Sequence, residues 1–165
     1  MDEEAFDAFY AESFNRLVGQ LTAIIGDRTE AQDCVQEAFV RAWDQRRKLD
    51  TSQSPEAWVR TVAHRLAVSR WRRVMRGRRP ADRAVEPIPQ PSTPSPDRVA
   101  LERALAQISP DQRRALVLHH YADLSVNEIA EELKVPVGTV KARLSRGRAA
   151  LAALLNDAPL ETRHV

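Results

Sequence analysis

The chain has 165 residues, of which 43% are hydrophobic, and this is enough to bury one ordinary core or two small ones. It contains no run of eighteen apolar residues, which excludes a membrane-spanning helix of the usual kind. The first ten residues, MDEEAFDAFY, are acidic where a secretory signal would be basic, so we expect a cytoplasmic protein. The single cysteine, Cys34, cannot form an internal disulfide, and we expect an inert, partly buried thiol there.

The net charge of +2 conceals an alternation of acidic and basic segments along the chain. Residues 1–50 carry 6 basic and 11 acidic side chains, and residues 51–83 carry 9 and 2. Residues 84–132 carry 4 and 8, and residues 133–165 carry 6 and 2. The pattern of an acidic segment followed by a basic segment occurs twice. It predicts two modules, each with one surface for a polyanion and another for a different partner.

Three amphipathic helices are predicted in the first module, residues 1–79, and together they form a small helical bundle. We expect Thr29 with Gln32 to cap the second helix, Ser54–Pro55 to open the third, and residues 46–54 to form a polar loop between them. Apolar residues recur every three or four positions: Phe6, Phe9, Tyr10, Phe14, Leu17, Val18 and Leu21 in the first helix, Val35, Ala38, Phe39, Ala42 and Trp43 in the second, and Trp58, Val59, Val62 and Leu66 in the third.

A proline-rich segment separates this module from the second. Residues 80–96, PADRAVEPIPQPSTPSP, contain six of the ten prolines and no apolar period, which predicts a flexible, extended linker. The second module, residues 97–156, is also predicted to be all-α, and residues 157–165 to be a frayed tail. Its first two helices carry Val99, Leu101, Ala104, Leu105 and Ile108, and then, after the Ser109–Pro110 cap with Gln112, the inward-facing Leu116, Val117 and Tyr121.

Residues 123–151 predict a helix-turn-helix. Ser125 with Glu128 forms a capping box, and Ile129, Ala130 and Leu133 share one face of the helix that follows. Val140 and Leu144 give the next helix an inner stripe, and its outer face carries Lys141, Arg143, Ser145, Arg146 and Arg148. A docked helix with a basic outer face is typical of DNA major-groove readers, and the alternative interpretation is a merely solvated basic face.

A second basic block follows a different pattern, because arginines alternate with tryptophan. It comprises Arg60, Arg65, Arg70, Arg72, Arg73, Arg76, Arg78 and Arg79, interleaved with Trp58 and Trp71. Arginine binds phosphates and indoles stack on unpaired bases, so this block is typical of a single-strand nucleic-acid site. We expect Trp58 in the core, whereas Trp71 could either stack on a base or anchor the helix.

Catalysis is not supported by any motif. With five glycines there is no Gly-rich phosphate loop, and the carboxylates fall on solvated faces. The adjacent His119 and His120 point about 100° apart on a helix, which suits one core and one surface histidine better than a shared metal. We therefore expect no catalytic residue, cofactor or metal. The outer face of the second helix, which is Asp33, Gln36, Glu37, Val40, Arg41 and Asp44, is either solvated or a dock for a basic protein helix.

Three segments, in order, resemble the group IV, or extracytoplasmic-function, sigma factors of bacterial RNA polymerase, and the resemblance covers about residues 5–155. DRTEAQDCVQEAFVRAWDQ is similar to the family's segment for the polymerase clamp helices, and SPEAWVRTVAHRLAVSRWRR to its helix that melts promoters at the minus-10 element. LSVNEIAEELKVPVGTVKARLSRGRAAL resembles its minus-35 reader. The resemblance implies a sigma-2-like domain at 1–79 and a sigma-4-like domain at 97–156.

The family's roles transfer to this chain residue by residue. The resemblance implies polymerase docking by Asp33, Gln36, Glu37, Val40, Arg41 and Asp44, and binding of the melted minus-10 strand by Arg60, His64, Arg65, Ser69, Trp71, Arg72 and Arg73. It implies minus-35 contacts by Pro136, Val137, Gly138, Thr139, Lys141, Ala142, Arg143, Ser145, Arg146 and Arg148. The implied partners are core polymerase, through its clamp helices and flap, promoter DNA and an anti-sigma factor, with no small-molecule substrate and no membrane insertion.

The chain departs from the family at three positions, and two of them are among the residues just named. Arg65 and Ser69 stand where many relatives have Asn and Asp, so the minus-10 base preference does not transfer. Lys134 stands where relatives often have glycine, and a left-handed backbone there costs lysine about 1 kcal/mol. Two rival hypotheses stay open: a stand-alone helix-turn-helix regulator, which has no need of the arginine–tryptophan helix, and a decoy that binds polymerase without using promoters.

Overall fold

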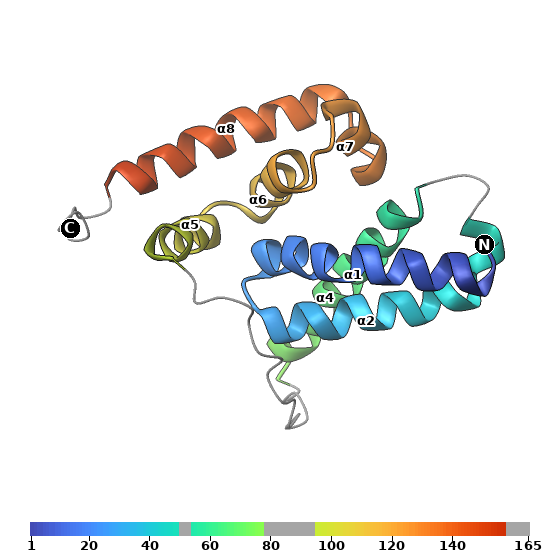
Figure 1. The fold of residues 1–165 in the computed structure, drawn as a ribbon. Helices are drawn as coiled ribbons and strands as arrows, with labels where there is room; N and C mark the ends of the chain where they lie inside the picture. Colours follow the sequence, from blue (N-terminus) through green and yellow to red (C-terminus); the bar gives the residue numbers. More distant parts are fainter. Residues whose placement is uncertain (50–53, 78–94, 158–165) are drawn as a thin grey trace. The chain divides into compact units, whose positions relative to one another are not determined.

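The computed structural model describes residues 1–49, 54–77 and 95–157, and within these ranges the regular structure is helical, with no strand (Figure 1). The chain divides into two compact units, Met1–Ile88 and Pro89–Val165. The all-α fold with two small helical domains is therefore confirmed. The predicted linker, apart from Ser95 and Pro96, and the tail beyond Asp157 lie outside the described residues. No described helix is long and apolar enough to cross a membrane.

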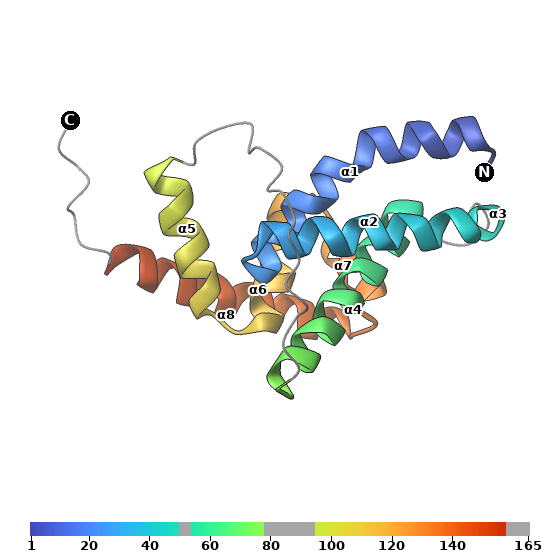
Figure 2. The same cartoon turned by 90° about the horizontal axis from the view of Figure 1, so that it is seen from below.

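The first unit consists of α1 (Glu3–Ile25), α2 (Arg28–Asp44), α3 (Arg46–Leu49) and α4 (Pro55–Met75). Helices α1 and α2 run antiparallel, and α4 packs against both of them (Figures 1 and 2). Their predicted apolar stripes meet in one core, except that Tyr10 is 38% exposed. Trp58 packs against this core, as predicted. The buried core residues are Phe6, Leu17, Val18, Leu21, Ala31, Cys34, Val35, Ala38, Phe39, Ala42, Leu49, Val59, Ala63 and Ala67.

The helix ends of this unit differ from the prediction at two places. Helix α2 is capped by Asp27, whose carboxylate accepts from the Glu30 amide at 3.0 Å, so the prediction of a Thr29–Gln32 cap was wrong. The predicted polar loop begins instead with the short helix α3, because Leu49 is buried against the core. The Ser54–Pro55 start of α4 is confirmed, since the Ser54 hydroxyl accepts from the Ala57 amide.

The second unit consists of α5 (Pro96–Gln107), α6 (Pro110–Leu116), the π-helix η1 (Val117–Tyr121), α7 (Val126–Leu133) and α8 (Val137–Asn156). Helix α5 begins at Pro96, the last residue of the segment predicted as linker, because Ser95 caps it. The long helix α8 packs against α5, α6 and α7. The buried core residues are Leu105, Ile108, Ala115, Leu116, Leu118, Ile129, Ala130, Val140 and Leu144.

A π-helical turn interrupts the helix predicted to begin at Ser109. The Ala122 amide donates to the Val117 carbonyl, five residues back, at 3.0 Å. The wider turn leaves Tyr121 52% exposed, so the prediction that Tyr121 points inward was wrong. His119 is half-buried and its Nδ1 donates to the Leu124 carbonyl at 2.8 Å, whereas His120 is exposed. The prediction of one core and one surface histidine is confirmed for His120, whereas His119 is half-buried and is not among the buried core residues.

Gly147 lets α8 approach α6 closely. A Cβ atom at this position would lie 3.0 Å from Leu116 Cδ1 and 3.3 Å from Gln112 Cβ. Gly147→Val should therefore lower the free energy of unfolding by about 1–3 kcal/mol, because its extra carbons overpack this contact. Gly138→Val is the matched control, since nothing lies within 4 Å of a Cβ there. Urea unfolding of both variants checks this, and equal stabilities would contradict it.

Candidate nucleic-acid interface

Helix α8 presents a basic face on the side opposite its core stripe. Val140, Leu144 and Gly147 are buried and hold the helix against the second unit. Of the predicted minus-35 residues, Pro136, Gly138, Lys141, Ser145, Arg146 and Arg148 are exposed, and Val137, Thr139, Ala142 and Arg143 are half-buried. Arg143 is partly engaged within the unit, because its Nη2 atom lies 3.7 Å from Asp111 Oδ2. The face can therefore contact a polyanion over at least two helical turns.

The helix-turn-helix has the predicted capping box at the start of α7, and its turn contains a left-handed lysine. The Ser125 hydroxyl accepts from the Glu128 amide, and the Glu128 carboxylate accepts from the Ser125 amide, which completes the capping box. Lys134 ends α7 with φ 56° and ψ 47°, the left-handed conformation that costs a non-glycine residue about 1 kcal/mol. The turn between α7 and α8 thus keeps the left-handed conformation that glycine would adopt without strain.

Helix α4 carries the second predicted nucleic-acid surface. Arg65, Ser69, Trp71, Arg72 and Arg73 are exposed, and His64 is half-buried. Trp71 is 62% exposed, which favours stacking over anchoring.

Arg60 differs from the other predicted strand-binding residues. It is only 9% exposed, and its Nη1 atom donates to Gln20 Oε1 of α1 at 3.1 Å. The side chain points into the unit because Gln20, itself buried, offers the acceptor that a buried guanidinium needs. Arg60 therefore holds α4 against α1 and is not part of the exposed surface.

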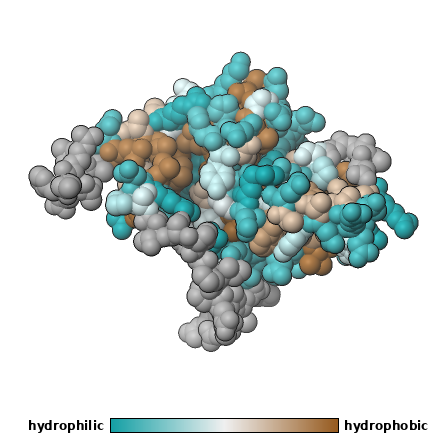
Figure 3. All heavy atoms as spheres, viewed as in Figure 1, coloured by the Kyte–Doolittle hydropathy of each residue, from teal (hydrophilic) through white to brown (hydrophobic). Residues whose placement is uncertain are grey.

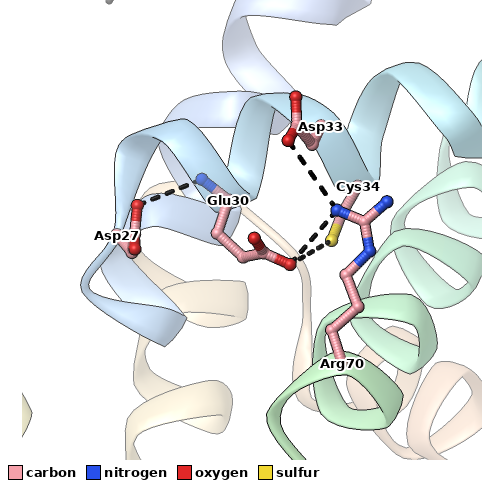
Figure 4. Close-up of polar contacts among 5 residues, drawn as sticks. All are labelled: Asp27, Glu30, Asp33, Cys34 and Arg70. Carbon is pink, nitrogen blue, oxygen red and sulfur yellow. Dashed lines mark hydrogen bonds and ion pairs between the residues drawn. The ribbon is translucent and has the colours of Figure 1, made fainter. Parts of the chain in front are cut away.

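Arg70 also points away from the exposed surface, toward α2 (Figure 4). Its Nη1 atom donates to Glu30 Oε1 at 3.2 Å and lies 3.9 Å from Asp33 Oδ2. The Cys34 thiol donates to the same Glu30 oxygen at 3.7 Å. These contacts join α4 to the face of α2 that carries the predicted docking residues.

Cys34 is fully buried, and burial raises the pKa of its thiol to about 12. Because the thiolate is the reactive form, Cys34 should react with a disulfide reagent at pH 8 roughly a thousandfold more slowly than a peptide cysteine. The rate should rise with pH, since the pKa lies above the working range, and should become fast in urea. Thiol-release kinetics check this prediction. Rapid labelling of the folded chain would contradict it.

The outer face of α2 is mixed acidic and apolar. Gln36, Val40, Arg41 and Asp44 are exposed, while Asp33 and Glu37 are half-buried. Arg41 Nε lies 3.3 Å from Glu37 Oε1, and the two residues form an ion pair one helical turn apart. Val40 is 55% exposed and lies among these charges without apolar cover from the described part of the unit. An exposed apolar centre with a charged rim is the usual anatomy of a protein–protein interface.

Two exposed apolar residues were not predicted as site residues. Val74 is 47% and Met75 is 68% exposed, and both follow Trp71 at helical spacing, so the three side chains share one side of α4. Their spacing of three and four among the arginines was the signal that could have revealed them.

A different apolar area lies on the second unit. Brown surface gathers over α5 and the C-terminal half of α8, where Leu101 and Leu155 are each about two-fifths exposed (Figure 3). Within the described ranges no group of three or more His, Cys, Asp or Glu side chains could hold a metal ion.

Comparisons with known proteins agree with this arrangement. Residues 9–77 match the family described as sigma-70 region 2, and residues 98–151 match the family described as sigma-70, region 4. The RNA polymerase sigma-H factor of Pseudomonas aeruginosa is 31% identical over 169 residues, which cover 91% of this chain and 86% of the relative. The ECF RNA polymerase sigma factor SigL of Mycobacterium tuberculosis is 33% identical over 157 residues, covering 91% and 88%.

Solved structures share the fold. The sigma factor RpoE in complex with the anti-sigma factor NepR from Bartonella quintana superposes with a TM-score of 0.76 at 23% identity, over 94% of this chain and 99% of that one. CnrH in complex with the cytosolic domain of CnrY gives a TM-score of 0.68 at 22% identity, over 96% and 92%.

Two helical units, one with an exposed arginine–tryptophan helix and one with a helix-turn-helix, define a DNA-binding protein. The chain belongs to the extracytoplasmic-function RNA polymerase sigma factors of the sigma-70 family. As such it binds core RNA polymerase, directs promoter recognition, DNA melting and transcription initiation, and is not an enzyme.

Proposed function

We propose that this sigma factor assigns promoter reading, strand capture and polymerase docking to three separate helix faces. The first unit, residues 1–79, would dock polymerase through α2 and hold the melted minus-10 strand through α4. The second, residues 97–156, would read the minus-35 duplex through α8, with residues 80–96 as the linker and 157–165 as the tail. The observation that carries this proposal is that the exposed basic side chains of α4 and α8 lie opposite buried core stripes.

The minus-35 contacts divide into base reading and phosphate binding. Lys141, Ala142, Ser145 and Arg146 follow one another along α8 at the positions a major groove would receive. Residues 136–139 start the helix, where backbone amides favour a phosphate. Arg143 contributes less in this proposal, because Asp111 already pairs with it.

The minus-10 contacts combine stacking with phosphate binding. Trp71 is the stacking platform, and Arg65, Arg72 and Arg73 bind the strand's phosphates, with His64 and Ser69 beside them. Binding energy alone would favour the melted strand, because extruded bases contact these groups and paired bases do not. Arg60 is left out of this surface because it is buried against Gln20.

Polymerase docking would use the exposed centre of α2. Val40 supplies apolar contact, and Gln36, Glu37, Arg41 and Asp44 supply the polar rim, while Asp33 is shared with Arg70. We also propose that the chain acts in the cytoplasm, where core polymerase is found, and that an anti-sigma factor binds it, as the anti-sigma factor NepR binds RpoE in their complex.

The decisive experiment is run-off transcription. The purified chain is added to bacterial core polymerase with genomic DNA fragments, and promoter-dependent transcripts are expected only when both are present. Core binding without transcripts would favour the decoy hypothesis. If the chain neither bound core polymerase nor supported transcripts, only the hypothesis of a stand-alone regulator would remain.

Arg146→Ala tests the separation of the three faces. We expect this variant to lose about 1–3 kcal/mol of duplex binding at the upstream promoter element, because Arg146 is exposed on the groove-facing side of α8. Core binding should be unchanged. DNase footprints of the holoenzyme, together with a core-binding titration, measure the two effects. A loss of core affinity would show that the surfaces are not separate.

A further inference from the structure

His120 has no role in the sites described above, and it forms a polar pair with Arg148, which the family resemblance places among the minus-35 contacts. His120 lies on η1 and Arg148 on α8, 28 residues apart in the chain. Arg148 Nε donates to His120 Nε2 at 3.3 Å, and both side chains are exposed. Two cationic residue types therefore meet at the surface, joined by a hydrogen bond that only a neutral imidazole can accept.

The π-helical turn brings His120 to this position. Its wide spacing gives His119 a partner in the Leu124 carbonyl at 2.8 Å, which fixes the His119 ring. The His120 ring packs edge-on against it, with the centroids 4.9 Å apart and the planes at 79°. His120 is thus held by His119 on one side and by Arg148 on the other.

The pair has unused hydrogen-bonding capacity. In the described part of the chain the terminal amines of Arg148 have no partner, so they remain available to an anion. The charged and titratable groups that act on His120 are Arg148 of α8 and His119 of η1 itself, and no carboxylate is among them. Burial, followed by Arg148 and His119, lowers the pKa of His120, so the ring is neutral at pH 7.

The pair continues the basic face of α8. Arg148 follows Lys141 and Ser145 at spacings of seven and three residues, which place all three on one side of the helix. Beyond the base-reading positions of such a helix, duplex DNA presents backbone phosphates. Arginine binds a phosphate through two parallel hydrogen bonds. We propose that His120 and Arg148 together bind one backbone phosphate of duplex DNA at the edge of the α8 basic face. The proposal rests on the proposed function of α8.

Proton uptake follows from this geometry. A phosphate that takes the Arg148 donors brings a negative charge to His120 and favours the imidazolium, whose Nε2–H then donates to the phosphate. The pKa of His120 would therefore be lowered in the free chain and raised in the complex. Duplex affinity should increase as the pH falls from the pKa of His120 in the complex to its pKa in the free chain. Above both pKa values, the titration of His120 should not affect duplex affinity.

The test uses the full chain and a fluorescein-labelled, random-sequence duplex of about 30 base pairs at low salt. Fluorescence anisotropy should show about threefold or more tightening between about pH 7.5 and pH 6 for the unchanged chain, up to a limit of about tenfold per pH unit for one proton. His120→Gln should remove this pH dependence, because glutamine accepts the Arg148 bond but does not titrate. Arg148→Gln should weaken binding at both pH values. His164→Gln, which changes a histidine with no role in the proposed sites, is the matched control and should keep the pH dependence.

A second readout separates phosphate binding from a structural role. The His120 ring resonances, followed by NMR, should titrate at higher pH once the duplex is added, which packing alone would not cause. An unchanged His120 titration, a His120→Gln variant with unchanged pH dependence, or an unmodified chain that does not bind the duplex would each overturn the proposal. If run-off transcription succeeds while these tests fail, only this inference is lost. If transcription fails while proton-linked binding is seen, the polymerase role is lost instead.

Discussion

Val40→Glu should weaken the binding of this sigma factor to core RNA polymerase by about thirtyfold or more, which corresponds to a loss of about 2 kcal/mol at the centre of an interface. Val40 is 55% exposed at the middle of the mixed face of α2, so a carboxylate there is solvated in the free chain and desolvated on docking. The stability of the free chain should change by less than about 0.5 kcal/mol, since the site is on the surface. A competition titration against a labelled sigma factor measures the affinity.

The matched control for this variant is Val74→Glu. Val74 is also exposed, at 47%, and lies on α4 instead of α2. It should leave core binding unchanged and impair promoter opening. Equal losses of core affinity in the two variants would contradict the assignment of docking to α2.

Trp71→Ala should reduce open-complex formation by about fivefold to a hundredfold, because one base loses its stacking partner, worth about 1–3 kcal/mol. Trp71 is 62% exposed, and its removal leaves no cavity in the described core. Permanganate reactivity of unpaired thymines at the promoter, with the variant bound to core polymerase, measures the opening. Core binding and minus-35 footprints should be unaffected.

Trp71→Phe is the control that distinguishes stacking from bulk. Phenylalanine retains a π face and should recover much of the opening. If the alanine and phenylalanine variants both opened the promoter as well as the unchanged chain does, the indole would have no role in strand capture.

The elements that were predictable from the sequence have local causes. The capping box at Ser125 and Glu128, the Ser54–Pro55 helix start and the apolar stripes of α2 and α8 each depend on residues within one or two turns. The left-handed conformation of Lys134 was considered only because relatives often have glycine there, and the structure shows that lysine adopts it. The three helix faces proposed as sites follow from the same periodicity.

Features that depend on tertiary contacts were not predictable in this way. Arg60 has the spacing of its exposed neighbours, and only the acceptor of Gln20, forty residues away, turns it inward. Arg70 is drawn to Glu30 by the same kind of long-range pairing. The π-helical turn at Val117–Tyr121 has no sequence signature, yet it exposes Tyr121 and brings His120 to Arg148. Periodicity places a side chain on a helix face but does not show which residues of other helices contact it.

The orientation of Arg60 and Arg70 has a consequence for the response of this protein to ionic strength. Of the five arginines of α4, these two are engaged with Gln20 and with Glu30 and Asp33, while the side chains of Arg65, Arg72 and Arg73 have no partner among the described residues. Each phosphate neutralised on a single strand contributes about 0.7 to the slope of log affinity against log salt concentration. Strand capture by α4 should then have a salt slope of roughly −2.1, whereas a count of all its arginines would give roughly −3.5. Promoter opening would accordingly tolerate changes in salt concentration better than the number of arginines on this helix implies.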